Sequence, residues 1–151
     1  MQDSFSISIP LDQDGFVELE CDYCKTRFML GREVYEDEKY IDFFCPICGL
    51  ANSINTFFVP EVLEEAQQIA TNIALDELNR ALNNSCKQIN KNGLIKMSVK
   101  TPKKEHVREL YHPINDYEVC SKKCCNLFIK LKAIDKATLS YCPVCGVMND
   151  E

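Results

Sequence analysis

The sequence contains no tryptophan, only two histidines and five glycines, and no long uncharged apolar run. Without such a run, no segment has the length or apolar character of a signal peptide or of a membrane span. The first six residues, MQDSFS, also lack a basic stretch of the kind that begins a signal peptide. We therefore expect a cytoplasmic protein in reducing surroundings that makes no use of a membrane.

Motifs for catalysis are also lacking. The sequence has no glycine-rich phosphate loop, no paired-carboxylate signature and no serine elbow. His106 and His112 lie in a charged segment with no motif around them, and Cys86, alone on a helix face, has no basic partner. We therefore expect that the protein is not an enzyme.

Cysteine, in contrast, is abundant, with ten residues in 151. The cysteines are gathered near both ends of the chain in closely spaced pairs, and two of these pairs have the form C-P-x-C-G. A C-x2-C turn points both sulfurs to one side, and the glycine that follows permits a positive φ. Paired knuckles favour a metal over a disulfide framework.

The first predicted metal site consists of Cys21, Cys24, Cys45 and Cys48. The second includes Cys142 and Cys145, and two further ligands come from Cys120, Cys124 and Cys125. Adjacent cysteines point in different directions along an extended chain, so we do not expect both members of the adjacent pair in one site. Asn126 can adopt the left-handed conformation, which favours Cys120 with Cys125. The spacing from Cys124 to Phe128, the same as that from Cys24 to Phe28, favours Cys124 in place of Cys125. We predict Cys120 and Cys125 as the ligands, with Cys124 as the alternative to Cys125.

Four thiolates suit zinc, and we expect two zinc ions per chain. Iron held as in rubredoxin is the alternative. A tetrathiolate site leaves no open coordination position for a substrate, which agrees with the expected lack of catalysis.

The pattern predicts that strands lead into the knuckles. Residues 16–20 alternate apolar and acidic side chains before the first knuckle, and residues 39–44 precede the second, so we expect these strands to pair. The order of strands and knuckles resembles that of the zinc-ribbon superfamily, which has the rubredoxin-like knuckle fold. The resemblance covers residues 16–50 and again 115–147, and it implies the fold and the metal rather than one function.

A long helix is predicted between the ribbons. From Pro60 to about Asn90 apolar residues recur at steps of three and four, and Gly93 follows. We predict an α+β protein with two small β zinc ribbons connected by one long amphipathic helix. The expected domains are a ribbon with an edge strand over 1–55, a helix over 56–93, and a basic strand or loop with the second ribbon over 94–151.

The charge is unevenly distributed. Residues 1–86 carry a net charge of −11 and residues 87–136 one of +7. The predicted partner surface in the basic part consists of Lys96, Lys100, Lys103, Lys104 and Arg108. We expect a zinc-binding adaptor with a protein partner, and a homodimer through helix 60–90 is a further hypothesis. The alternatives are a nucleic-acid-binding ribbon protein that uses 87–136, and an iron tetrathiolate electron carrier.

Overall fold

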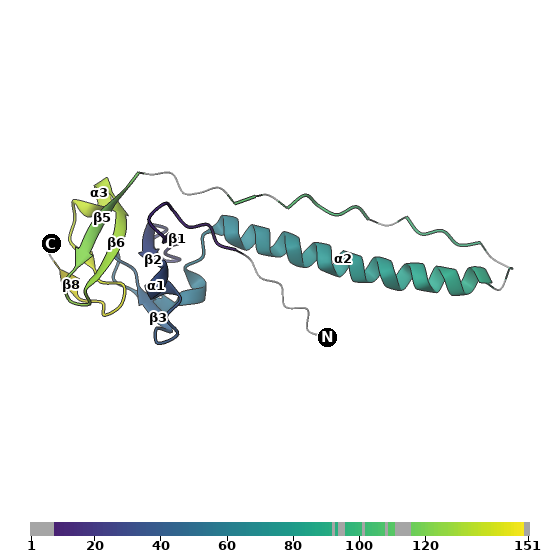
Figure 1. Ribbon diagram of the computed structural model, residues 1–151, viewed down its shortest axis with the longest axis horizontal. Coiled ribbons are helices and arrows are strands. Elements are labelled where there is room, and N and C mark those ends of the chain that lie inside the picture. Colours follow the sequence, from purple (N-terminus) through teal and green to yellow (C-terminus); the bar gives the residue numbers. More distant parts are fainter. Residues whose placement is uncertain are drawn as a thin grey trace. The chain divides into compact units, whose positions relative to one another are not determined.

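The computed structural model describes residues 8–91, 93, 96–100, 102–107, 109–110 and 116–149 (Figure 1). Its elements confirm the predicted α+β class. In chain order they are β1 (Phe16–Glu20), β2 (Arg27–Gly31), α1 (Arg32–Tyr35), β3 (Asp42–Phe44), β4 (Ala51–Ser53), the 3-10 turn Ile54–Thr56, α2 (Pro60–Lys91), β5 (Tyr117–Lys122), β6 (Leu127–Lys132), α3 (Ala133–Lys136), β7 (Ser140–Tyr141) and β8 (Met148–Asn149).

The chain divides into two compact units. The first, which we call the ribbon unit, comprises residues 1–62 and 110–151, and the second, the helical unit, comprises residues 63–109. The predicted domains 1–55 and 94–151 differ from this division, because the strands of both ribbons belong to one unit. The reason is a strand pairing between the ribbons that no local pattern reveals.

A four-stranded antiparallel sheet joins the two ribbons in the order β1-β2-β6-β5, and Figure 1 labels all four strands. Each outer pair is a hairpin closed by a knuckle, and the central pair, β2 with β6, links the first ribbon to the second. Two shorter hairpins, β3-β4 and β7-β8, carry the remaining knuckles. The predicted pairing of 16–20 with 39–44 is therefore wrong: β1 pairs with β2, its immediate neighbour along the chain.

The two ribbons are related by an approximate twofold axis. At the centre of the sheet Met29 lies opposite Lys130, and these residues hold equivalent positions in β2 and β6. The same twofold symmetry relates two backbone hydrogen bonds outside the sheet. The backbone N–H of Phe44 donates to the carbonyl of Pro143 at 2.8 Å, and that of Tyr141 donates to the carbonyl of Pro46 at 2.7 Å. A chain with two similar ribbons thus folds as an internal dimer.

A single core lies beneath this sheet. Its largest fully buried apolar side chains come from both ribbons and from the connector before α2, and the rings of Phe28 and Phe57 meet edge to face at 5.8 Å. The core residues include Val17, Leu19, Phe28, Leu30, Phe43, Phe57, Leu127, Ile129 and Leu131. Since neither ribbon of this size would bury enough apolar surface alone, the shared core gives each ribbon part of the burial it needs.

The long helix is confirmed as α2, and the turn after it has Gly93 at a φ of +73°. Of the predicted strand at 94–101, residues 96–100 are irregular, and 94, 95 and 101 lie outside the described residues. The predicted edge strand near the N-terminus is described only from residue 8, and there Leu11 makes an isolated antiparallel bridge with Val17.

Candidate metal centre

The first predicted site comes together as expected, and we call it the first cage. The sulfurs of Cys21, Cys24, Cys45 and Cys48 all lie within 4.8 Å of one another. Cys21 and Cys48 are separated by 3.7 Å between sulfurs, and Cys24 and Cys45 by 3.6 Å. Four sulfurs about 2.3 Å from a zinc ion at tetrahedral angles would be about 3.8 Å apart. The donor set and its spacing therefore fit a tetrahedral metal.

Local backbone geometry forms these knuckles. Lys25, directly after Cys24, has a φ of +58°, and Gly49, directly after Cys48, has a φ of +73°. The left-handed residue turns the chain so that the N–H of Lys25 donates to the carbonyl of Cys21, and the N–H of Gly49 donates to that of Cys45, each at 2.9 Å. The sulfurs of Cys21 and Cys24 are thereby held at one end of the four-stranded sheet, and those of Cys45 and Cys48 at the end of the β3-β4 hairpin.

The four thiols of the first cage have different tendencies to ionise. Burial raises the pKa of Cys21 and, far more, that of Cys45. Burial acts in the same direction on Cys24, but hydrogen bonds from Thr26 more than offset it and bring the pKa of Cys24 to about 7. A divalent ion, which favours the thiolate form, would hold all four as thiolates.

The second cage consists of Cys124, Cys125, Cys142 and Cys145, whose sulfurs also lie within 4.8 Å of one another. The sulfurs of Cys124 and Cys145 are 3.4 Å apart. Both adjacent cysteines thus belong to one site, in contrast to the expectation that only one of them would. The turn between β5 and β6 is not extended, so the alternation of side chains along a strand does not apply to it.

Cys120 was predicted as a ligand of the second site, and this prediction is wrong. Cys120 lies within β5 opposite Ile129 and belongs to the buried core. Asn126 does adopt the predicted left-handed conformation, with a φ of +51°. Asn126 thus correctly identifies Cys125 as a cage residue. Cys120 lies within β5, outside the cage.

Comparison of the two hairpins reveals a residue that sequence reasoning missed. Lys25 and Asn126 are equivalent left-handed residues, so Cys24 corresponds to Cys125, and Cys21, three residues earlier, corresponds to Lys122. The pairing agrees, since the N–H of Cys21 donates to Thr26 and Lys122 lies opposite Leu127. Lys122 is 2% exposed, and its ammonium donates to both the carbonyl and the hydroxyl of Ser140.

The second cage is more open to solvent than the first. Cys124 and Cys145 are exposed and only Cys142 is buried, whereas Cys21 and Cys45 are both buried in the first cage. Burial and hydrogen bonding to Cys145 raise the pKa of Cys125. Burial would also raise that of Cys145, but the backbone N–H of Val147 and the neighbouring thiols lower it. None of the ten cysteines forms a disulfide.

The glycines of the two knuckles lie at the contact between the ribbons. A β-carbon on Gly49 would come within 2.9 Å of the Tyr141 ring, and one on Gly146 within 2.8 Å of the Phe44 ring. Each aromatic residue directly precedes a cage cysteine of its own ribbon. Each ring therefore covers the metal knuckle of the other ribbon, and each cage supports the packing between the two.

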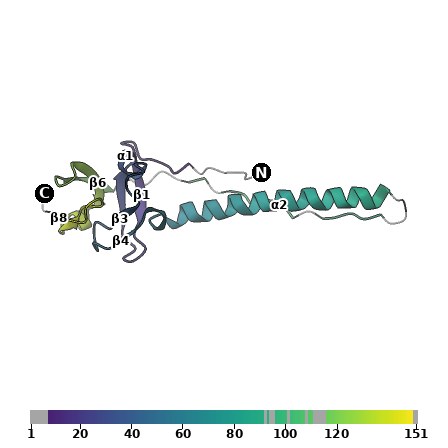
Figure 2. The ribbon, with the colours of Figure 1, turned by 90° about the horizontal axis from the view of Figure 1, so that it is seen from below.

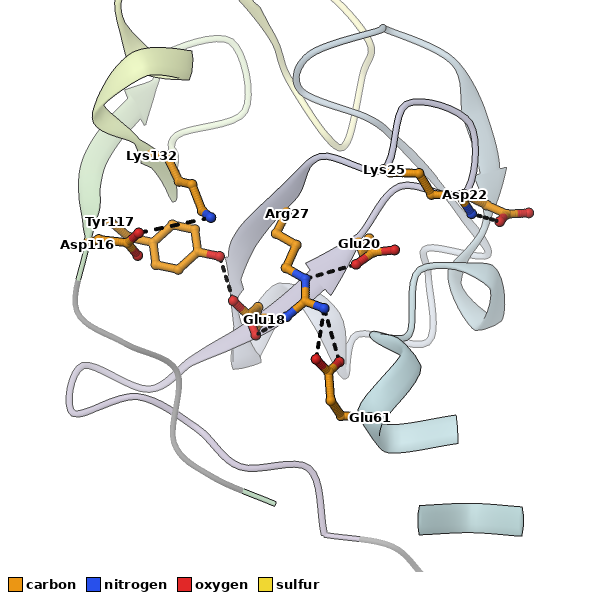
Figure 3. A network of polar contacts seen from close by, with 9 residues as sticks. All are labelled: Glu18, Glu20, Asp22, Lys25, Arg27, Glu61, Asp116, Tyr117 and Lys132. Atoms are coloured by element: carbon orange, nitrogen blue, oxygen red, sulfur yellow. Dashed lines mark hydrogen bonds and ion pairs between the residues drawn. The ribbon is translucent and has the colours of Figure 1, made fainter. Parts of the chain in front are cut away.

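A network of charged groups connects the outer face of the sheet with the first turn of α2 (Figure 3). Arg27 donates from Nε to Glu20 at 2.8 Å and from Nη2 to both oxygens of Glu61 at 2.9 and 3.1 Å. On the other side, the hydroxyl of Tyr117 donates to Glu18. Burial and this hydrogen bond raise the pKa of Tyr117, which keeps the hydroxyl protonated as a donor.

The predicted partner surface is described in part. Lys96, Lys100, Lys103 and Lys104 are exposed, and Arg108 lies outside the described residues, as does His112. Lys104 pairs with Asp76 at 2.6 Å between nitrogen and oxygen. None of the described helices combines the length and apolar character needed to cross a membrane.

Comparison with known proteins gives no relative. No family model matches the chain, and neither a curated protein nor a solved structure matches it. The two cysteine tetrads are consistent with zinc-ribbon sites.

Proposed function

We propose that this chain is a non-enzymatic zinc protein that binds a protein partner. Two zinc ions, each bound by four thiolates, would stabilise the paired ribbons that form the binding surface. The observation that supports the proposal most strongly is the pair of cysteine tetrads, each of which joins one end of the four-stranded sheet to a two-stranded hairpin. Four thiolates complete the coordination of zinc, so these ions would stabilise the fold and would not activate water or substrate.

The outer face of the β5-β6 hairpin is the partner surface that we propose. β5 is an edge strand, and Phe128 and Val119 extend from the same face of the hairpin, 57% and 49% exposed. Large exposed apolar side chains at a sheet edge are typical of surfaces that another protein covers. The fold supports this hairpin from below through the buried residues of β6.

The test compares Phe128→Ser with Ile41→Ser in zinc-loaded protein. Ile41 is 73% exposed near β3, so the control removes a similar exposed apolar side chain from another part of the ribbon unit. The measured quantity is the amount of partner protein recovered with each form after cross-linking in cells. We expect Phe128→Ser to recover at least tenfold less of a partner that wild type and Ile41→Ser both recover. Equal recovery of the partner by all three forms, or recovery of no partner by wild type, contradicts the proposed surface.

The hypotheses of iron and of a homodimer have direct tests. A ferric tetrathiolate protein absorbs visible light and is red, whereas the zinc form that we propose is colourless. On α2, Leu78 and Ile89 are 50% and 38% exposed, which supports the homodimer hypothesis. Sedimentation equilibrium of wild type and of a Leu78→Gln/Ile89→Gln variant decides whether two chains pair through α2.

A further inference from the structure

The second half of α2 and the segment that follows it carry a concentrated positive charge. Residues 78–104, which we call the basic segment, contain seven cationic residues and no aspartate or glutamate. The remainder of the chain carries a net charge of −13, since the total is −6. The cations are Arg80, Lys87, Lys91, Lys96, Lys100, Lys103 and Lys104.

Three of these cations form a stripe along α2. At 3.6 residues per turn, Arg80, Lys87 and Lys91 lie within about 20° of one line along the helix, over about 16 Å. All three side chains are exposed. Within the part of the basic segment that the structure describes, only Lys104 has a carboxylate at ion-pair distance.

Residues 96–100 and 102–107 run antiparallel to α2 beside it, where two asparagines hold them (Figures 1 and 2). The side-chain amide of Asn90 donates to the carbonyl of Met97 at 3.1 Å and accepts from its N–H at 2.9 Å. The amide of Asn72 makes the same pair of bonds with Glu105, at 2.9 and 3.0 Å. Each carboxamide thus pairs with the backbone as a neighbouring strand would.

The spacing of these two clamps fixes where the lysines of the returning chain lie. Asn72 and Asn90 are five helical turns apart, about 27 Å, and the eight steps from Met97 to Glu105 cover that length only when nearly extended. Both asparagines lie about 80° around the helix from the cationic stripe. Lys96 and Lys100, both exposed, thus belong to a segment that is clamped to the helix on a face about 80° from the stripe.

We propose that the basic segment binds the phosphate backbone of double-stranded nucleic acid. A duplex carries about one negative charge per 1.7 Å of its axis with both strands counted, so about ten charges lie along the 16 Å that the stripe spans. Exposed Asn83, Asn84 and Gln88 flank the stripe and could supply uncharged donors for phosphate oxygens. Residues 78–104 contain no aromatic side chain, so stacking with single-stranded bases has no platform there.

The placement of apolar residues argues against a membrane as the occupant. Leu78, Leu82 and Ile89 lie on the side of α2 opposite the stripe of Arg80, Lys87 and Lys91. If this apolar side entered a lipid surface, the stripe would point away from the anionic headgroups. The opposite charge of the ribbon unit would also keep a polyanion away from the remainder of the chain.

The experiment measures polarisation of a labelled 24-base-pair duplex with zinc-loaded, full-length protein at several salt concentrations. The test variant is Arg80→Gln/Lys87→Gln/Lys91→Gln, and the matched control is Arg32→Gln/Lys39→Gln/Lys132→Gln, which removes the same charge from the ribbon unit. Circular dichroism checks that the helix persists in both. Glutamine is a good helix former, so we expect no change in helicity.

We expect wild type to bind with a slope of log affinity against log salt of about −3 to −5. The test variant should lose at least tenfold in affinity and reduce the slope by about 2 to 3, whereas the control variant binds like wild type. Absence of binding at 50 mM salt, or equal losses in both variants, overturns the proposal. Tighter binding to vesicles with 30% anionic lipid, or self-association abolished by the test variant, assigns the segment to another occupant and also overturns it.

Discussion

Lys122 holds the position in the second ribbon that Cys21 holds in the first, and its ammonium donates to Ser140 at the start of β7. Ser140 lies two residues before Cys142, so the lysine joins the two segments that carry the second cage. The fourth sulfur comes from Cys124 instead, one residue before the usual ligand. The second cage is therefore a variant of the first with one ligand displaced along the chain.

This displacement predicts that an ordinary knuckle can be restored. Cys124→Ser should reduce the bound ions from two to one under mild chelation, because the cage loses its substitute ligand. Adding Lys122→Cys to that variant restores a C-x2-C pair with Cys125 and should return the count to two. Native mass spectrometry counts the ions in each form. Cys120→Ala is the control and should keep both ions, since Cys120 lies outside the cage. A double variant that still holds one ion contradicts the equivalence of Lys122 and Cys21.

The difference in exposure between the cages predicts two steps of metal release. With a colorimetric chelator in excess, we expect one equivalent of zinc to leave quickly from the second cage, where Cys124 and Cys145 are exposed. The other equivalent should leave slowly from the first cage, because Cys21 and Cys45 are buried. Stopped-flow absorbance measures both phases. A single phase of two equivalents would contradict this account of exposure.

The contact between ribbons predicts that Gly49→Ala is more costly than a comparable change elsewhere. The new β-carbon would clash with the Tyr141 ring, and alanine would also be strained by the left-handed backbone at this position. We expect the free energy of unfolding to fall by about 2–4 kcal/mol. Gly15→Ala is the matched control. It has a φ of +83° and nothing within 4 Å of the added carbon, so about 1 kcal/mol should be lost. Urea unfolding of zinc-loaded protein measures both, and equal losses would show that the rings yield freely.

The ion pair between Lys130 and Asp12 predicts a pH dependence. Both side chains are almost fully buried, and Lys130 also lies over the Phe16 ring, 4.6 Å from its centroid. Burial opposes the charge on each, but their mutual hydrogen bond raises the pKa of Lys130 and lowers that of Asp12. Lys130→Met should cost about 2–4 kcal/mol at pH 7, because it leaves a buried carboxylate without its cation.

The sign of each shift sets the pH window. The lysine contribution is complete below its unfolded pKa of about 10.4 and is lost as pH rises through the higher folded value. The aspartate contribution is complete above about 3.9 and is lost as pH falls through the lower folded value. The difference in unfolding free energy between wild type and Lys130→Met should thus be constant from about pH 6 to 9 and shrink at pH 11. Asp14→Asn, at an exposed partner, should change stability by less than 1 kcal/mol. A difference that grows at pH 11 would contradict this pairing.

The sequence predicts local features well. The long helix, the first cage and the left-handed Asn126 follow from spacing and backbone conformation, which neighbouring residues determine. The pairing of Met29 with Lys130 does not, because residues a hundred positions apart meet through a symmetry between two copies that differ in sequence. Without that symmetry, Cys120 resembles a ligand and Lys122 resembles one more surface lysine.

The predicted partner for β1 was wrong for a related reason. Residues 39–44 and 27–31 are both rich in apolar side chains and neither alternates regularly, so the pattern alone could not decide which segment lies beside Phe16–Glu20. The left-handed Lys25 decides it, since it folds the chain directly back after Cys24.

Native mass spectrometry of wild-type protein, purified without added metal, tests the central claim most directly. The claim is that two cages of four thiolates hold the paired ribbons together. We predict two zinc ions per chain in the folded protein. After chelation and acid treatment, we predict that the protein loses both ions and no longer shows the narrow charge-state distribution of a compact fold. Folded protein without bound metal, or with its cage cysteines joined as disulfides, would contradict the account.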